Sequence, residues 1–228
     1  MIKTGWTSAL MALAVGICAS CAQAAGEVFV IPAPTVDEPV TTAHTETAVF
    51  AGGCFWGVQG VYQHVKGVSQ AVSGYTGGQP QTAHYEQVGE GGTGHAESVQ
   101  VTFDPSQVSY GQLLQIYFSV VHDPTERDRQ GPDSGSQYRS TVFAQTPEQH
   151  QVAQAYISQL NGTGVYSKPL ATTIEDNKTF YPAEGYHQNY LTLHPDAPYI
   201  AINDQPKVAN LAKVFASHYE QKPVLVKE

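Results

Sequence analysis

The spacing of apolar residues fits a strand in some segments and a helix in others along most of the chain. The order of these segments limits the possible folds more than any other feature of the sequence. The predicted strands cover residues 46–51, 68–75, 97–104 and 138–144. The predicted helices begin at Cys54, Ser109 and Thr146 and end near Gly67, Val121 and Gly162. The order strand, helix, strand, strand, helix, strand, followed by more helix, predicts an α+β fold with a ferredoxin-like split β-α-β core and extra C-terminal helices.

The other segments are predicted mainly from their composition. Gly-rich and polar loops are expected before Gly94 and after Val121, residues 171–182 resemble a strand, and helical pieces are expected around 184–191 and 208–219. There is no internal repeat and no sign of a second domain. The predicted boundaries are a signal peptide at 1–24, a Pro/Thr-rich linker at 25–45, one domain at 46–221 and a tail at 222–228.

The N-terminal segment has the pattern of a secretory signal. Lys3 gives the positive end, Ala9 to Cys18 form a short apolar run, and Ala22-Gln23-Ala24 is a small-residue cleavage site. Because the apolar run is too short to remain in a bilayer, we expect a periplasmic or secreted protein. Lipid attachment through Cys21 is the alternative, but Cys18 stands where such a motif has a large aliphatic residue.

Composition excludes several classes of function. The formal net charge is −9, with 11 Lys and Arg scattered singly, which disfavours binding to nucleic acid. The nine histidines show no metal-ligand spacing, and Cys54 is the one cysteine outside the signal, so no structural zinc site is expected. No phosphate loop or dinucleotide fingerprint is present, so we expect no bound cofactor.

Cys54 follows Gly52-Gly53 where a strand passes into a helix. Unpaired N–H groups and the helix dipole at such a position stabilise a thiolate, which predicts a lowered pKa and a reactive nucleophile. Gly53 permits a tight turn and the approach of a ligand to the backbone. A buried, inert cysteine is the alternative. Phe55 and Trp56 point about 100° apart on the helix, so at least one of them is expected to line the mouth of the site, and the pair suits a small apolar group such as a methyl.

Glu97 enters a predicted strand from the Gly-rich segment GGTGHAE. A carboxyl in such an apolar place has a raised pKa and can donate a proton near neutral pH, whereas the alternative is a solvated glutamate at a strand end. Other polar candidates lie in loops and in a helical segment. They are Tyr85 in TAHYEQVG, Asp133, Gln137 and Tyr138 in GPDSGSQYRS, and His187 in EGYHQNYL, where an ordinary core or surface histidine is the alternative.

Four motifs, GGCFWG, GGTGHAE, DSGSQYRS and YHQNY, closely resemble the peptide methionine sulfoxide reductase A family from about Glu46 to His194. The resemblance implies thiol-dependent reduction of methionine-S-sulfoxide, free or in proteins, to methionine, as repair of oxidative damage. It implies that Cys54 attacks the sulfoxide sulfur and becomes a sulfenic acid while Glu97 protonates the oxygen. Tyr85 and Tyr138 match positions that hydrogen-bond the oxygen. The implied substrate-binding residues are Gly53, Phe55, Trp56, Asp133 and His187.

The sequence departs from many members of this family, which carry resolving cysteines near the C-terminus, because no cysteine follows Cys54. We therefore expect a one-cysteine enzyme whose sulfenic acid is reduced by an external thiol, either a thioredoxin-like protein or a small thiol. We also expect a monomer without a membrane span. Three other possibilities stay open at this point. They are a cysteine hydrolase or acyltransferase with His95 or His187 as base, a non-enzymatic module that binds oxidised methionine, and reversible dimerisation through a Cys54 disulfide.

Overall fold

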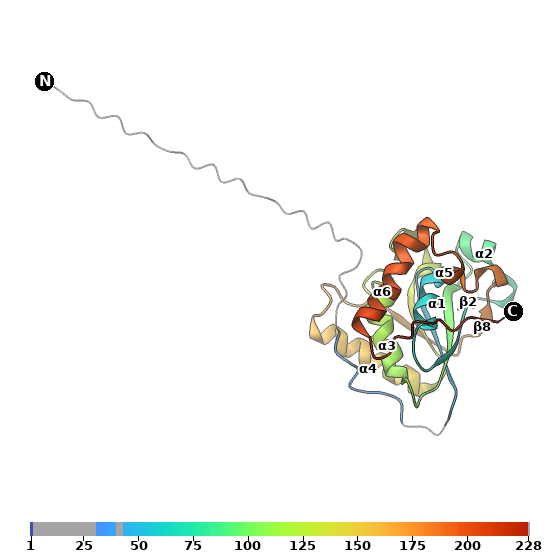
Figure 1. The fold of residues 1–228 in the computed structure, drawn as a ribbon, viewed down its shortest axis with the longest axis horizontal. Helices are drawn as coiled ribbons and strands as arrows, with labels where there is room; N and C mark the ends of the chain where they lie inside the picture. Colours follow the sequence, from blue (N-terminus) through green and yellow to red (C-terminus); the bar gives the residue numbers. More distant parts are fainter. Residues whose placement is uncertain (2–30, 40–42, 228) are drawn as a thin grey trace.

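A six-stranded mixed sheet forms the centre of the protein (Figure 1). The computed structural model describes Met1 and residues 31–39 and 43–227, so the predicted signal peptide, from its second residue on, lies outside the described residues. The strands are β1 (Glu46–Gly52), β2 (Val68–Thr76), β3 (Ala96–Phe103), β6 (Ser140–Ala144), β7 (Thr173–Asp176) and β8 (Phe180–Pro182). Their order is β7-β6-β1-β3-β2-β8, and the neighbours are antiparallel except for the parallel pair β6 and β7. A separate short hairpin joins β4 (Arg129–Gln130) to β5 (Asp133–Ser134).

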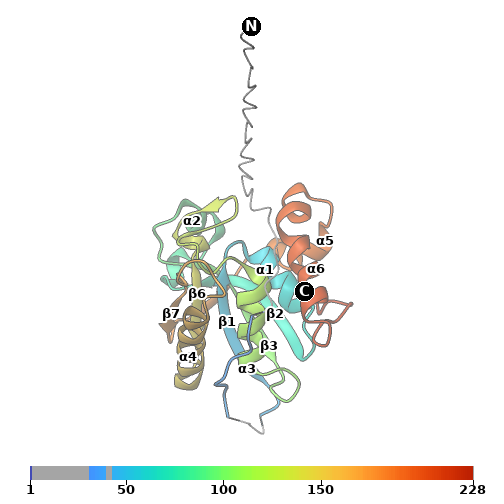
Figure 2. The ribbon, with the colours of Figure 1, turned by 90° about the vertical axis from the view of Figure 1, so that its left-hand side faces the viewer.

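Helices cover one face of this sheet. The α-helices are α1 (Phe55–Gln63), α2 (Tyr85–Glu90), α3 (Tyr110–Ile116), α4 (Pro147–Thr163), α5 (Tyr190–Leu193) and α6 (Gln205–Val214). Shorter 3₁₀ and π turns are η1 (Pro80–Thr82), η2 (Tyr117–Val121), η3 (Ser136–Tyr138), η4 (Gly185–His187) and η5 (Ile200–Asp204). The helix α1 packs on β1 to β3, α4 packs on β6 and β7, and α3 lies against α4 (Figure 2). The predicted α+β class is therefore confirmed. In the described part of the chain, no helix is both long and apolar enough to span a bilayer.

The residues of β1 face two cores in alternation, as expected for a strand. Phe50 faces the main core beneath α1 and α3, and Val49 faces a smaller cluster on the other side of the sheet. The Phe50 ring stacks on the rings of Tyr62 and Tyr117, each at a centroid distance of 5.3 Å. These contacts fix α1 and η2 against β1, so the end of β1 has a defined position.

The segments before β1 and after α6 also pack on the domain. The Asp37 carboxylate accepts the N–H of Gly111 at 2.8 Å, at the start of α3. At the other end of the chain, the N–H of Val226 donates to Asn189 Oδ1 at 2.9 Å. Because neither segment shows a sustained hydrophobic period, the sequence does not indicate these contacts.

The structure differs from the sequence prediction in three segments. Residues 171–182 form two strands at opposite edges of the sheet, β7 and β8, because the chain turns at Asn177, whose φ is +51°. The helix expected around 184–191 is interrupted at Asn189, whose φ is +61° and whose N–H donates to Gln59 Oε1 at 2.8 Å. The loop expected between β2 and β3 contains the short helix α2.

Candidate active site

The junction of β1 and α1 lies between α2 on one side and α5 on the other (Figure 2). Cys54 is the residue before α1 and is buried, with 8% of its surface exposed. Glu97 is the second residue of β3, which runs antiparallel to β1, so the last residues of β1 and the first residues of β3 lie side by side at the same end of the sheet. The helix therefore begins within one residue of its predicted start, and Cys54 and Glu97 enter one site from adjacent strands.

Gly53 is held in a conformation that a side chain would disturb. Its φ is +88°, in the left-handed region, and a Cβ there would lie 2.7 Å from Gln130 Cβ. Gln130 is itself fixed, because its side-chain nitrogen donates to the Asp123 carbonyl at 2.7 Å and its Oε1 accepts the Asp123 N–H at 3.0 Å. The hairpin of β4 and β5 thus supports the backbone immediately before Cys54.

The Glu97 carboxyl is buried beside the start of α1. Glu97 is only 3% exposed, and its Oε2 accepts the N–H of Phe55 at 3.0 Å. Burial raises the pKa of this carboxyl to about 8; the Phe55 N–H lowers the pKa, and the charges of Asp133 and Asp204 raise it. Glu97 therefore keeps its proton at neutral pH, and the alternative of a solvated glutamate is excluded.

The predicted low pKa of the Cys54 thiol is wrong for the protein without substrate. Burial raises the pKa of Cys54 well above its ordinary value; the Asp204 carboxyl raises it further, as does the Glu97 carboxyl once that group is ionised. A hydrogen bond from the Trp56 N–H and the charge of Lys207 lower the pKa, but they do not compensate. The sequence shows the helix start correctly, but it does not show how completely the sulfur is removed from water.

Two phenols approach the same centre from different elements. Tyr85 begins α2 and is 37% exposed, whereas Tyr138 ends η3 and is half-buried. Burial raises the pKa of both phenols, and the charges of Glu97 and Cys54 raise it further. Both hydroxyls therefore keep their protons at neutral pH and can donate to an oxygen atom.

The two adjacent aromatic residues have different environments, as their directions on a helix predict. Phe55 is 1% exposed and belongs to the core. Trp56 is partly exposed; its ring stacks on Tyr190 at a centroid distance of 3.8 Å and meets Tyr199 edge-on at 5.9 Å. Trp56 and these two tyrosines therefore form an aromatic wall beside Cys54.

His187 is buried next to this wall. Its Nδ1 accepts the Trp56 indole N–H at 3.2 Å, and its ring centroid lies 4.4 Å from that of Tyr85. Burial lowers the pKa of His187, so the ring is neutral at pH 7, and this hydrogen bond assigns the proton to Nε2. Among the described residues, Nε2 has no hydrogen-bond partner.

Neither candidate histidine is paired with Cys54 in the described chain. Both ring nitrogens of His95 are engaged, since Nδ1 accepts the Gly78 N–H at 3.2 Å and Nε2 lies 2.9 Å from the Gln79 carbonyl. Burial also lowers the pKa of His95. The Cys–His pair of a hydrolase is therefore not formed by His95 or His187. Over the same residues, no group of three or more His, Cys, Asp or Glu side chains is arranged to hold a metal ion.

The C-terminal part of the chain adds residues that the sequence patterns did not indicate. The Tyr199 hydroxyl donates to the Asp133 carboxylate and so connects the hairpin of β4 and β5 to the aromatic wall. Asp204 and Lys207 pack against Gly57 of α1. No motif or spacing connects these positions with a cysteine about 150 residues earlier, so only the fold identifies them. Gln137, in contrast, was a candidate; its side chain donates to the Gly89 carbonyl of α2 at 3.1 Å.

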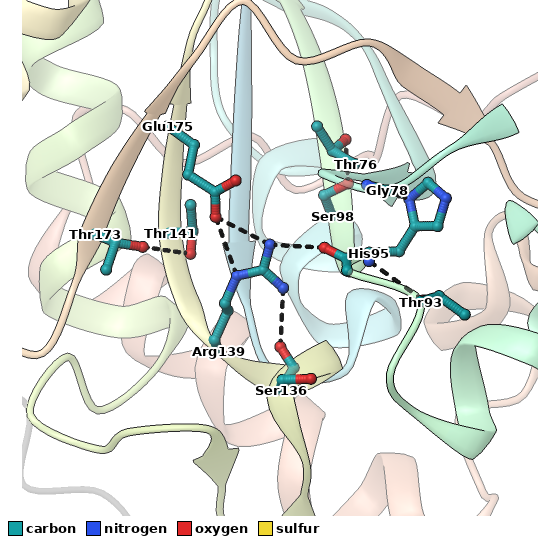
Figure 3. Close-up of polar contacts among 11 residues, drawn as sticks. Thr76, Gly78, Thr93, His95, Ser98, Ser136, Arg139, Thr141, Thr173 and Glu175 are labelled. Carbon is teal, nitrogen blue, oxygen red and sulfur yellow. Dashed lines mark hydrogen bonds and ion pairs between the residues drawn. The ribbon is translucent and has the colours of Figure 1, made fainter.

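Arg139 connects the segments that carry Tyr138 and Glu97 (Figure 3). Its guanidinium donates to the Ser136 carbonyl at 3.0 Å and to the Gly94 carbonyl at 3.1 Å. An ion pair of 3.0 Å with Glu175 attaches the same group to β7. Gly94 is three residues before Glu97, and Arg139 follows Tyr138. The Arg139 side chain therefore holds the segment that leads to Glu97 and the segment that carries Tyr138 in fixed positions.

Comparison with known proteins gives a consistent result. A family model described as peptide methionine sulfoxide reductase matches residues 46–219. A curated relative from Mesorhizobium japonicum, peptide methionine sulfoxide reductase MsrA 2, is 66% identical over 182 residues, or 80% of this chain and 93% of the relative. A relative of the same name from Synechocystis is 51% identical over 196 residues, or 85% of this chain and 90% of the relative.

Solved structures agree with this result. Reduced Mxr1 from Saccharomyces cerevisiae is 31% identical, with a TM-score of 0.61 over 70% of this chain and 91% of that structure. Methionine sulfoxide reductase A of Corynebacterium diphtheriae is 26% identical, with a TM-score of 0.56 over 78% of this chain and 92% of that structure. The sequence motifs, the site around Cys54 and these likenesses agree: the chain belongs to the peptide methionine sulfoxide reductase family.

Proposed function

We infer that this protein reduces methionine-S-sulfoxide to methionine with Cys54 as the nucleophile and Glu97 as the acid. The observation that carries this assignment is the placement of a buried thiol and a buried, protonated carboxyl at the start of one helix. The Phe55 N–H, 3.0 Å from Glu97 Oε2, fixes the carboxyl there. A sulfoxide oxygen must be protonated before it can leave sulfur, and Glu97 holds a proton at neutral pH.

The proposed step transfers one oxygen atom and two electrons. Cys54 sulfur attacks the sulfoxide sulfur and forms a transient bond between the two sulfurs, while Glu97 protonates the oxygen. The bond between oxygen and the substrate sulfur and the bond between the two sulfurs then break as a bond forms between the oxygen and the Cys54 sulfur, which leaves methionine and a Cys54 sulfenic acid. Methionine leaves reduced by two electrons, and the cysteine is oxidised by two. The thiol proton of Cys54 restores the proton that Glu97 gave, so the balance closes without a metal or another cofactor.

The surrounding residues are assigned by the groups they can offer. Tyr85 and Tyr138 keep their phenolic protons and donate to the sulfoxide oxygen as its negative charge grows. Trp56 and the buried Phe55 bound the place of the substrate methyl, and Gly53 provides the left-handed turn immediately before Cys54. Asp133, through Tyr199, and His187, through the Trp56 indole, hold this wall in place.

The second half of the cycle requires electrons from another molecule. No cysteine follows Cys54 in the sequence, so we propose that an external thiol reduces the sulfenic acid directly. Two thiols per turnover give a disulfide and water and restore Cys54. A thioredoxin-like protein and a small thiol are both chemically suited, and the protein itself holds no bound cofactor in this scheme.

The remaining assignments rest on the sequence. The signal pattern supports export to the periplasm or the medium rather than lipid attachment at Cys21, with a linker to residue 45, a catalytic domain over 46–221 and a tail over 222–228. Free and protein-bound methionine sulfoxide are both proposed substrates, and the protein is proposed to act as a monomer. The antiparallel order β6-β1-β3-β2 supports a ferredoxin-like split β-α-β description of the centre of the sheet.

An epimer-resolved assay tests this function. The full chain is incubated with an equal mixture of methionine-S-sulfoxide and methionine-R-sulfoxide and a small dithiol, and the two epimers and methionine are separated by chromatography. We expect loss of the S-epimer alone, with formation of an equal amount of methionine. Consumption of both epimers at equal rates, or of neither, would contradict the assignment.

A further inference from the structure

A buried ion pair lies against the first turn of α1, close to Cys54. Asp204, at the end of η5, is fully buried, and its Oδ1 lies 3.0 Å from Nζ of Lys207, whose side chain is 20% exposed. Gly57 makes room for the pair, since a Cβ there would lie 2.7 Å from Asp204 Cγ and 2.8 Å from Lys207 Nζ. Because Gly57 is three residues after Cys54, both charges lie along the helical turn that carries the nucleophile.

The Asp204 carboxylate is not explained by the stability of its own helix. Asp204 precedes α6, where an aspartate commonly accepts N–H groups of the first turn, but its side chain makes no such hydrogen bond. Its second oxygen, Oδ2, has no hydrogen-bond partner among the described residues. Burial of a carboxylate oxygen that has no hydrogen-bond partner lowers the free energy of unfolding. The presence of Asp204 therefore points to a role other than stability.

Several ionisable groups face Cys54, and they carry different charges. They come from α2, β3, η3, the segment before η5, η5 and α6, and they are Tyr85, Glu97, Tyr138, Tyr199, Asp204 and Lys207. Asp133 of β5 acts on the Glu97 carboxyl. At neutral pH Glu97 and the phenols are uncharged. Burial is the largest influence on the charge of Cys54, and Asp204 and Lys207 change it in opposite directions.

We propose that Asp204 and Lys207 are positioning residues that adjust the charge on Cys54, with Lys207 stabilising the thiolate and the Asp204 carboxylate disfavouring it. This proposal rests on the assignment of Cys54 as the nucleophile. A thiol that was always ionised would be oxidised in the absence of substrate. Burial and the carboxylate together keep the resting thiol protonated, and the cation remains beside the helix to stabilise the thiolate when the substrate sulfur is in place.

Single charge removals in this pair test the proposal, because the two substitutions should have opposite effects. The rate constant for iodoacetamide alkylation of Cys54 at pH 7 is measured on the full chain by mass spectrometry of the peptide that contains Cys54. A charge within a few ångströms changes the pKa of a thiol by about one unit, and the thiolate is the reactive form. We therefore expect alkylation to become about tenfold slower in Lys207→Met and about tenfold faster in Asp204→Asn.

Matched variants separate charge from general loosening of the site. Lys213 of α6 and Asp196 are exposed, so Lys213→Met and Asp196→Asn remove the same charges away from Gly57 and should leave the rate within about twofold. Lys207→Arg keeps the charge and should also stay near the rate of the natural protein. Loosening accelerates alkylation in every variant, so a slower rate in Lys207→Met cannot come from loosening.

The alkylation rates test the proposal without any need for sulfoxide reduction. Changes in the same direction in Lys207→Met and Asp204→Asn, or no change in either, would overturn it. If Lys207→Met does not fold, Asp204→Asn alone decides, because an unchanged or slower rate there contradicts the proposed effect of the carboxylate. Alkylation does not require sulfoxide reduction, so failure of this proposal leaves the reductase assay unaffected, and failure of the reductase assay leaves these rates meaningful.

Discussion

Glu97 should make the stability of the folded protein depend on pH, and Glu97→Gln should remove that dependence. In the unfolded chain the carboxyl titrates near its ordinary value of 4.5, whereas in the folded protein its pKa is about 8. Between these values the unfolded state releases a proton that the folded state retains, so the free energy of unfolding falls as the pH rises from 4.5 to 8. This rise in the pKa of Glu97 corresponds to a loss of roughly 5 kcal/mol in the free energy of unfolding between pH 4.5 and pH 8.

Urea unfolding at pH 5 and at pH 8.5, followed by tryptophan fluorescence, measures this loss. Glutamine has nearly the same shape and can still accept the Phe55 N–H, but it does not titrate. The natural protein should therefore lose several kcal/mol more than Glu97→Gln between the two pH values. Glu90→Gln, at an exposed position of α2, is the matched control and should behave like the natural protein.

The difference between the two proteins is the decisive quantity, because other groups that titrate contribute equally to both. A difference below about 1 kcal/mol between pH 5 and pH 8.5 would refute the argument that Glu97 is kept protonated by burial. The same substitution should slow sulfoxide reduction by about 10²–10⁴-fold, since the oxygen then lacks its acid, while thiol labelling of Cys54 remains largely intact.

Three further substitutions should have separable effects. Cys54→Ser should abolish methionine formation in the reductase assay while leaving the circular dichroism spectrum unchanged; retained full turnover would remove Cys54 from the mechanism. Gly53→Ala should lower the free energy of unfolding by about 2 kcal/mol, measured in urea, because its Cβ meets Gln130 at a positive φ; an unchanged value would contradict this backbone argument. Arg139→Lys should lower kcat about tenfold with a smaller change in KM, because an ammonium cannot hold the Gly94 carbonyl and its other partners together; equal kinetics would contradict the positioning argument.

The positions of Cys54 and Glu97 could be predicted from the sequence because each depends on the residues next to it in the chain. A short apolar strand, two glycines and a helical period fix the position of Cys54 at the start of a helix, and alternation fixes Glu97 near the start of a strand. Antiparallel pairing of β1 and β3 then brings the two residues together. The rise in the pKa of Glu97 follows from the same pattern, because the apolar residues at the start of this strand indicate that Glu97 is buried.

The rest of the site depends on contacts between distant segments. Tyr199, Asp204 and Lys207 reach α1 through the packing of η5 and α6, and no spacing in the sequence predicts that contact. The pKa of Cys54 was predicted in the wrong direction for the same reason, since the helix start is local but burial is a property of the whole fold. The left-handed residue Asn177 separates β7 from β8, and a short polar turn of this kind is hard to recognise within an extended segment.

A single turnover tests the central claim most directly. The full chain is reduced, freed of reductant and mixed with excess methionine-S-sulfoxide in the presence of a sulfenic-acid trap. Methionine is counted, and the modified cysteine is located by peptide mass spectrometry. We expect about one methionine per chain and a trapped sulfenic acid on Cys54. No methionine, with Cys54 recovered as a free thiol, would contradict the role of Cys54 as the nucleophile.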